Sequence, residues 1–178
     1  MWDWVIFTDE KRFNLVGNDA YQSIWVEGKK IYTHEIGRTS RVGLMVWGAI
    51  SCDGGLHLIC IDERITSETY CNMLENDFFH EMEGQLPEDF VWMHDNATPH
   101  AAAATKAYLE EKGIDVMEWP VLSPDLNLIK NIWGIMCQKL YENGKSYQNT
   151  NELWEAIVQA WHSLDVQVFR NLYNSMHR

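Results

Sequence analysis

Two short apolar runs, each followed closely by an aspartate, place the strongest limit on how this chain folds. Asp9 follows Trp4–Phe7, and Asp95 follows Phe90–Met93, each after one intervening residue. A run that is apolar on both faces suits a central strand of a sheet that is covered on both sides. Open α/β sheets place their sites at strand ends, although aspartate is also common where a turn begins. We therefore expect two central strands with converging terminal carboxylates.

The periodicity elsewhere predicts strands first, then alternating strands and helices, then helices. Further strands are expected at 23–26, 42–51, 56–61 and 116–119, and helices at 66–83, 101–112, 128–141, 149–163 and 165–176. The stretch 28–41 has little periodicity and is expected to be an extended loop or loose hairpin. No internal repeat or linker is found. The pattern predicts a single α/β domain over 1–178, with a mixed sheet and helices packed on it. Four tryptophans are expected in the core: Trp47, Trp92, Trp119 and Trp133.

The composition excludes several classes of protein. With 178 residues, 46% of them hydrophobic, and only 4 prolines, the chain is neither disordered nor collagen-like. It has no apolar run of about 18 residues, so no membrane span is expected. The first residues lack the features of a signal peptide. The 4 cysteines have neither paired nor zinc-type spacing, which favours reduced thiols in an intracellular, non-secreted protein.

The charge is unevenly distributed. The net charge is -12, whereas nucleic-acid-binding domains are usually basic. Residues 62–89 hold nine acids against one arginine, and residues 28–41 reverse the sign. Ordinary solvated surface explains both stretches. The second also permits contacts with phosphates through Lys29, Lys30, Arg38 and Arg41.

Converging carboxylates at the ends of neighbouring strands are ligands of the kind that Mg²⁺ and Mn²⁺ prefer. Two such ions can hold the attacking and leaving oxygens of a phosphodiester displacement. That chemistry usually needs a third carboxylate. The obvious place for it is the helix that follows the last strand.

Four strings along the chain resemble one family. They are VIFTDEKRFNL (5–15), LMVWGAIS (44–51), HDNATPHAA (94–102) and WPVLSPDLNLIKNIWG (119–134). In these strings the chain resembles the catalytic domain of Tc1/mariner transposases, the Tc1 branch in particular. The resemblance implies an RNase H-like fold, as in retroviral integrase cores, and a DDE site with two Mg²⁺ or Mn²⁺ ions. It also implies DNA cleavage at transposon ends and strand transfer at TA sites, with no small-molecule cofactor.

The resemblance assigns the first two catalytic acids to Asp9 and Asp95, both also metal ligands. In the family pattern the third acid is a glutamate separated from the second acid by 34 intervening residues, within a string close to SPDLNPIENLWG. This chain has SPDLNLIKNIWG, with Leu128 for the proline and Lys130 for the glutamate. The mismatch in the most diagnostic string puts the activity in doubt.

A protonated lysine has no acceptor and cannot bind a metal ion. Deprotonating it at neutral pH costs about 5 kcal/mol, at about 1.36 kcal/mol per pKa unit. We therefore expect Lys130 to pair with Asp9 or Asp95 and to impair strand cleavage. The alternative is that another group replaces the missing acid; the candidates are Asp125, Asn131 and Glu10.

The resemblance implies roles for some other residues. His100 matches a family histidine and is expected either to contact DNA near the site or only to begin a helix. Asn96 is expected to support Asp95. The 28–41 loop falls where related transposases hold a partner subunit and DNA, so a homodimer is possible. The N-terminal helix-turn-helix domains of such transposases are not expected in this chain, and a nuclear location is expected.

Two rivals stay open at this stage. A domesticated or decayed copy would serve as a non-catalytic DNA-binding or dimerisation module. A different RNase H-like nuclease, such as a resolvase or ribonuclease H, is disfavoured because those families lack the string SPDLN…NIWG.

Overall fold

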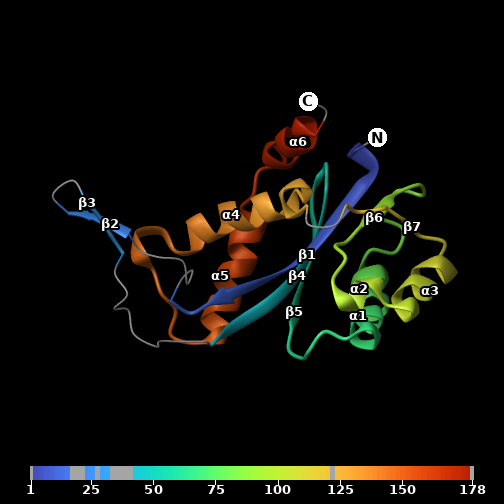
Figure 1. Ribbon diagram of the computed structural model, residues 1–178, viewed down its shortest axis with the longest axis horizontal. Coiled ribbons are helices and arrows are strands. Elements are labelled where there is room, and N and C mark those ends of the chain that lie inside the picture. Colours follow the sequence, from blue (N-terminus) through green and yellow to red (C-terminus); the bar gives the residue numbers. More distant parts are fainter. Residues whose placement is uncertain (1, 17–22, 27–28, 33–41, 121–122, 177–178) are drawn as a thin grey trace.

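A five-stranded mixed sheet lies between two groups of helices (Figure 1). The structure is a computed structural model that describes residues 2–16, 23–26, 29–32, 42–120 and 123–176. In these residues the strand order is β5-β4-β1-β6-β7. The strands of this sheet are β1 (Val5–Asn14), β4 (Gly43–Ser51), β5 (Gly54–Ile61), β6 (Val91–Met93) and β7 (Asp115–Val116). The expected α/β class is confirmed.

Strand β1 is the centre of the sheet, as its apolar run predicts. It pairs with β4 in antiparallel and with β6 in parallel orientation. The expectation that the strand ends at Asp9 is wrong, because β1 continues to Asn14 along β4. The parallel ladder, however, stops at the pair Phe7 and Met93. Asp9 therefore lies just beyond the place where β6 leaves β1, and Asp95 follows β6 at the same edge.

The helices cover the two faces of the sheet separately. The short α1 (Ser67–Met73), η2 (Leu74–Phe79), α2 (Thr98–Ala101) and α3 (Ala103–Glu111) lie on one side, and α4 (Ile129–Leu140), α5 (Thr150–His162) and α6 (Val166–Ser175) on the other (Figure 1). Successive side chains of β1 point to opposite faces of the sheet and pack into the hydrophobic core on each face. Val5 and Phe7 pack with α4–α6, and Ile6 packs with α1 and α3. The same alternation sends Asp9 toward α4 and Glu10 toward α2.

Two expected helices are interrupted. The helix expected over 66–83 begins with a capping box at Thr66 and changes to a π-helix, η2, at Leu74. The helix expected over 101–112 is the slightly shorter α3, and Ala102, extended with ψ 144°, separates it from α2, which the sequence did not predict. The strand expected over 116–119 is shorter and begins one residue earlier, as β7 (Asp115–Val116). Beyond its end, the Met117 amide still donates to the Trp92 carbonyl at 2.8 Å.

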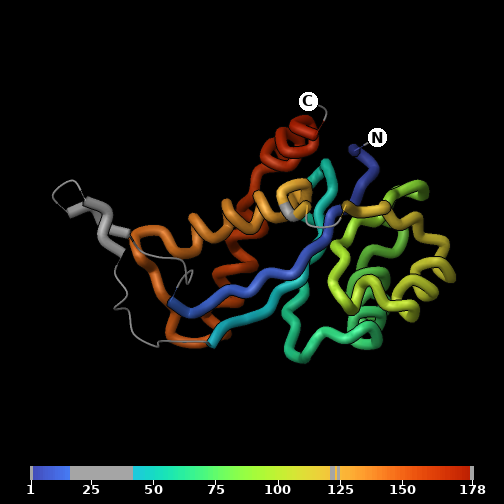
Figure 2. The backbone as a smooth tube through the Cα atoms, viewed as in Figure 1, coloured from blue at the N-terminus to red at the C-terminus, as the bar shows by residue number. Residues whose placement is uncertain are grey.

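The strand expected over 23–26 is β2 (Ser23–Val26), which forms a separate hairpin with β3 (Lys29–Tyr32) at the start of the basic stretch. The rest of that stretch, 33–41, lies outside the described residues. Arg38 and Arg41 lie outside the described residues. At the end of the chain, α6 lies beside the start of β1 (Figure 2). There Tyr173 Oη donates to the Val5 carbonyl at 2.8 Å. No helix in the described ranges is long and apolar enough to cross a membrane.

Candidate active site

Lys130 and Asp9 form a two-pronged ion pair at the centre of the site. Lys130 lies in the first turn of α4, and its Nζ donates to Oδ1 and Oδ2 of Asp9, each at 2.8 Å. The Asp9 side chain is 7% exposed and the Lys130 side chain 38%, so the ammonium reaches the carboxylate from the solvent side. The expected pairing of Lys130 with one of the two aspartates is confirmed at Asp9.

Burial and Lys130 act on Asp9 in opposite directions. Burial raises the pKa of Asp9 above its ordinary value, and the hydrogen bonds from Lys130 lower it by less. A further donor comes from α4: the indole Nε1 of Trp133 lies 3.2 Å from Asp9 Oδ2. The two carboxylate oxygens of Asp9 are thus held by three donated hydrogen bonds.

Gly48 makes room for the indole that reaches Asp9. In the β1–β4 register Gly48 lies opposite Asp9, and a Cβ there would be 2.6 Å from Cη2 of Trp133. Trp133 is 3% exposed and packs against Phe13 and Trp161, as its expected core position predicts. Glycine at position 48 therefore allows one core side chain to serve also as a donor to Asp9.

The start of α4 is fixed to β1 next to Asp9. Asn127 is buried; its Nδ2 donates to the Thr8 carbonyl at 3.0 Å, and its Oδ1 accepts from the Ile129 amide at 3.3 Å. Leu128, in the place of the family proline, is 3% exposed with φ -59°, a value that proline also adopts. The leucine keeps the backbone geometry and adds core contacts, so Lys130 is presented to Asp9 by a well-anchored helix.

His100 holds the second aspartate. Its Nδ1 donates to Asp95 Oδ1 at 2.8 Å, and the Ala97 amide donates to the same oxygen at 2.9 Å. On its other side, Nε2 of His100 lies 3.3 Å from Glu10 Oε1, close enough for an ion pair although not aligned as a hydrogen bond. His100 is thus inserted between two carboxylates from different strands.

The histidine is charged at neutral pH. Burial lowers the pKa of His100, but Asp95 and Glu10 together raise it to about 9. The hydrogen bond from His100 is the main cause that lowers the pKa of Asp95 to about 2. Three carboxylates, one ammonium and one imidazolium leave the site with a net charge of -1.

A second histidine backs the first. The rings of His94 and His100 stack at 5.0 Å, and Tyr70 Oη lies 3.2 Å from His94 Nδ1. Burial lowers the pKa of His94 to about 4, so this ring is neutral. A neutral ring beside a charged one avoids repulsion between them.

The three candidate replacements for the missing acid lie apart from Asp9. Glu10 projects to the opposite face of β1 and contacts His100. Asp125 and Asn131 are exposed, in η3 (Pro124–Leu126) and on α4 respectively. Among the residues that the structure describes, no group of three histidine, cysteine, aspartate or glutamate side chains is placed to hold a metal ion. The residues present therefore do not fit the expected two-metal site.

The other predicted site residues are placed as follows. His100 is 3% exposed and contacts both Glu10 and Asp95, so it can reach DNA only when these contacts are broken. The expected DNA contact stays a prediction. Asn96 donates to the Trp119 carbonyl at 2.9 Å, and its support of Asp95 also stays a prediction. Lys29 and Lys30 lie in β3, but their side chains are outside the described part of the chain.

Comparison with known families decides the relationship. The family described as DDE superfamily endonuclease matches residues 4–154. The chain belongs to this family. The Tc3 transposase of Caenorhabditis elegans is 34% identical to it over 176 residues, which are 98% of this chain and 54% of that protein. Human histone-lysine N-methyltransferase SETMAR is 27% identical over 161 residues, or 83% of this chain and 23% of that protein. This DDE domain spans about half the length of the Tc3 transposase.

Solved structures agree on the fold. The Mos1 transposase paired-end complex with the left transposon end matches this DDE domain with a TM-score of 0.81 and 18% identity, over 98% of this chain and 52% of that one. The Mos1 mariner paired-end complex with Mn matches with a TM-score of 0.80 and 17% identity, over 99% of this chain and 53% of that one. The expected RNase H-like fold is confirmed.

Sequence reasoning missed three parts of this site. Trp133 was expected only in the core, Asn127 was assigned no task, and Glu10 was expected only as a substitute ligand. The conjunction of Gly48 with a tryptophan on the facing helix is a signal of close packing, but nothing local in the sequence indicates that the indole reaches Asp9.

Proposed function

We propose that this chain is the catalytic domain of a Tc1/mariner-type transposase in which Lys130 impairs metal-dependent DNA cleavage and strand transfer at TA sites. The membership of the DDE family supports the first part. The two 2.8 Å bonds from Lys130 Nζ to the Asp9 oxygens carry the second part. A third observation, the absence of a three-acid cluster among the described residues, points the same way.

Both the charge of this site and the use of its carboxylate lone pairs oppose the binding of metal ions. In DDE chemistry two Mg²⁺ or Mn²⁺ ions, held by carboxylates, stabilise the attacking and leaving oxygens. Here the Asp9 oxygens accept hydrogen bonds from Lys130 and Trp133, and Asp95 accepts from His100. An ammonium in place of a carboxylate changes the local charge by two units, which disfavours cations. The residues of this chain therefore hold Asp9 and Asp95 in place but oppose the binding of ions between them.

DNA is the proposed partner, as transposon ends and a TA target. The paired-end complex of Mos1 with a transposon end supports this partner class by analogy of fold. Lys29, Lys30, Arg38 and Arg41 are the proposed phosphate contacts, with His100 near the reacting strand. The same 28–41 loop is proposed to form a homodimer. Because its substrate is DNA, the domain is proposed to act inside the cell, in the nucleus of its host.

The decisive experiment is a calorimetric titration of Mn²⁺ into three proteins: the parent, Lys130→Glu, and Lys130→Gln as the matched control. Lys130→Gln removes the positive charge without adding a carboxylate. We expect measurable binding only for Lys130→Glu, together with a rise in its melting temperature on adding Mn²⁺. Nicking of a supercoiled plasmid should follow the same order.

Two results would overturn this account of Lys130. The first is that Lys130→Glu binds Mn²⁺ no better than the parent, which would mean that the lysine is not what excludes the ions. The second is that the parent itself binds Mn²⁺ and nicks DNA, which would mean that a substitute ligand exists. Asp125 would then be the first residue to mutate.

A second candidate function is a domesticated, non-catalytic module for DNA binding or dimerisation. The similarity to a segment of SETMAR favours it, because that protein is named for a different activity, histone-lysine N-methylation. Such a module would bind duplex DNA without metal ions, with an affinity that falls with salt. Binding by the parent without any nicking by Lys130→Glu would favour this function over an impaired nuclease.

A further inference from the structure

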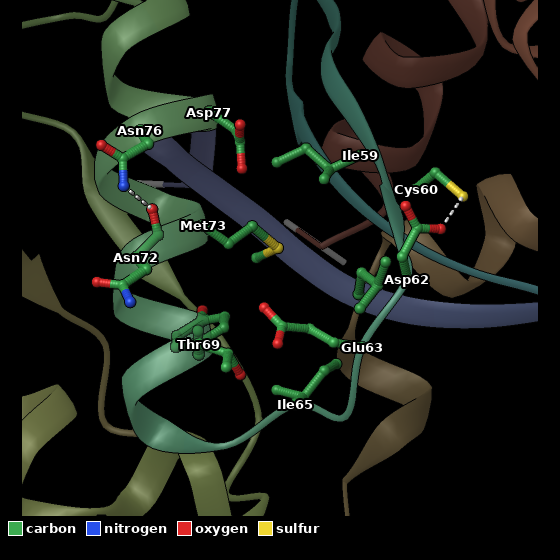
Figure 3. Close-up of a pocket in the computed structure, with 12 residues that line it drawn as sticks. Ile59, Cys60, Asp62, Glu63, Ile65, Thr69, Asn72, Met73, Asn76 and Asp77 are labelled. Carbon is green, nitrogen blue, oxygen red and sulfur yellow. Dashed lines mark hydrogen bonds between the residues drawn. The ribbon is translucent and has the colours of Figure 1, made fainter.

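A hollow of about 370 Å³ lies between the edge strand β5 and the helical pair α1–η2, on the face of the sheet opposite to α4 (Figure 3). We call it the β5 hollow. Asp9 and Lys130 are not part of it, because Asp9 faces α4 and Lys130 lies on α4. Its volume is at the lower end of the range for ligand sites, which suits one long side chain better than a large cofactor.

The walls of the β5 hollow combine an apolar surface with an acidic border. Ile59 of β5 and Met73 of α1 face each other across it (Figure 3). Carboxylates stand around this apolar strip: Asp62 and Glu63 follow β5, and Asp77 lies on η2. Among the residues that the structure describes, no lysine or arginine lines the hollow. The surface therefore offers contact to methylene groups and attraction to a positive charge at the same place.

The three carboxylates form no ion pair with a lysine or arginine within the described part of the chain. Asp77 lies near His57 of β5, whose pKa is lowered by burial and raised in part by Glu81 and Asp77. Two other surface acids do form ion pairs, Glu75 with Lys112 and Asp53 with Arg170. Asp62 accepts only a weak contact from the Cys60 thiol at 3.8 Å. Asp77 reaches the hollow because the π-helix changes the angular spacing of residues after Met73. An unpaired positive charge brought by a partner would balance these acids.

The alternatives fit less well. Among the described residues, Asp62, Glu63 and Asp77 do not form a group that could hold a metal ion. Nucleic acid would be repelled by the acids of residues 62–89, which outnumber bases by eight. A basic protein segment matches both features, because lysine and arginine lay their methylene stems on apolar surface and hold the charge at its border. The edge strand β5, which has no strand partner on its outer side in the described residues, offers backbone groups to an extended chain.

We propose that the β5 hollow is a docking site for an extended, basic protein segment, one arginine or lysine of which inserts between Ile59 and Met73 with its charge beside Asp62, Glu63 and Asp77. This proposal goes beyond the proposed function, since it needs neither a metal ion nor DNA cleavage. It also assigns a task to the acidic half of a domain whose expected substrate is an anion.

The test uses fluorescence anisotropy with the full chain at about 0.15 M salt, where the Debye length is about 8 Å. The probe is a fluorescein-labelled peptide of alternating arginine and threonine, compared with the same peptide carrying glutamate for arginine. Asp62→Asn/Asp77→Asn removes two charges from the hollow. The matched control, Glu83→Gln/Glu88→Gln, removes two exposed charges from the same acidic stretch outside the hollow. Asn72→Trp fills the hollow without changing any charge.

We expect the arginine peptide to bind the parent and the glutamate peptide not to bind. The hollow double variant should raise Kd about tenfold, as should Asn72→Trp, whereas the control should change Kd less than about twofold. Urea unfolding of each variant verifies that the fold is kept. An equal loss in both double variants would show a general charge effect and overturn the proposal. So would unchanged binding by Asn72→Trp, or no binding of the arginine peptide to the parent.

Discussion

Replacing Lys130 by methionine removes the ammonium from Asp9 while keeping a side chain of similar length. Two unit charges 2.8 Å apart attract by about 6 kcal/mol at an effective dielectric constant near 20, and by about 1.5 kcal/mol in water. Because Lys130 is 38% exposed, solvent screens the pair toward the lower value. Asp9, at 7% exposed, is left poorly solvated when its partner is removed. We expect Lys130→Met to lower the free energy of unfolding by about 2 kcal/mol near neutral pH.

The loss should depend on pH in a defined direction. Burial already raises the pKa of Asp9 in the folded state, and removing Lys130 raises it further. A carboxyl whose folded pKa lies above its unfolded value favours the fold only while it is protonated. The penalty of Lys130→Met is therefore small below the unfolded pKa, about 4, and grows as the pH rises through the folded pKa of Asp9.

Urea unfolding at an acidic and a neutral pH measures this penalty. Lys106→Met, an exposed lysine on α3, controls for the loss of a surface charge. The double variant Asp9→Asn/Lys130→Met should recover most of the loss, because no buried charge is then left alone. The reasoning is refuted when Lys130→Met costs no more than Lys106→Met at neutral pH, or when its penalty is the same at both pH values.

Three further predictions concern the groups around the two aspartates. Trp133→Phe keeps the aromatic packing but removes the donor to Asp9, and should lose about 1.5 kcal/mol in urea unfolding. Gly48→Ala forces a Cβ against Cη2 and Cζ2 of Trp133 and should lose about 2 kcal/mol, a loss that Trp133→Phe relieves in part because phenylalanine lacks these two indole atoms. The folded pKa of His100, about 9, lies above its unfolded value near 6.5, so its contribution of roughly 3 kcal/mol is fully present below pH 6.5 and lost as the pH rises through 9. His100→Gln should abolish that slope in a series of unfolding measurements from pH 6 to pH 10.

The strands were predictable where their side chains repeat with period two or are apolar on both faces. The length of β1 was not, because its second half carries Glu10, Lys11 and Arg12 and resembles a turn. Its backbone is held in the ladder by β4, which a local pattern cannot indicate. The break at Ala102 is also tertiary in origin: the residues are good helix formers, but Thr105 Oγ1 donates to the Pro99 carbonyl at 2.6 Å and closes the corner between α2 and α3.

The residues of the site also divide into those that the sequence predicts and those that it does not. Asp9 and Asp95 follow apolar runs, and Lys130 follows from the spacing of a string, so the sequence alone predicts all three positions. The donors to these residues were not. Trp133 and Asp9 are 124 positions apart, and their hydrogen bond depends on how α4 lies across β4. Glu10 neighbours Asp9 in the chain but faces the other core, so only the pleat of β1 reveals that it belongs to His100.

The ion pair of Asp9 with Lys130 also changes how the fold depends on its surroundings. Clustered carboxylates repel one another, and a site of three acids is stabilised by whatever divalent ions the solution supplies. In this domain the positive charge that balances Asp9 is the Lys130 ammonium, which is part of the chain and lies beside Asp9 on α4 in the folded protein. Its stability should therefore be the same in a chelator as in millimolar magnesium, so that the shape of the domain is uncoupled from the supply of metal.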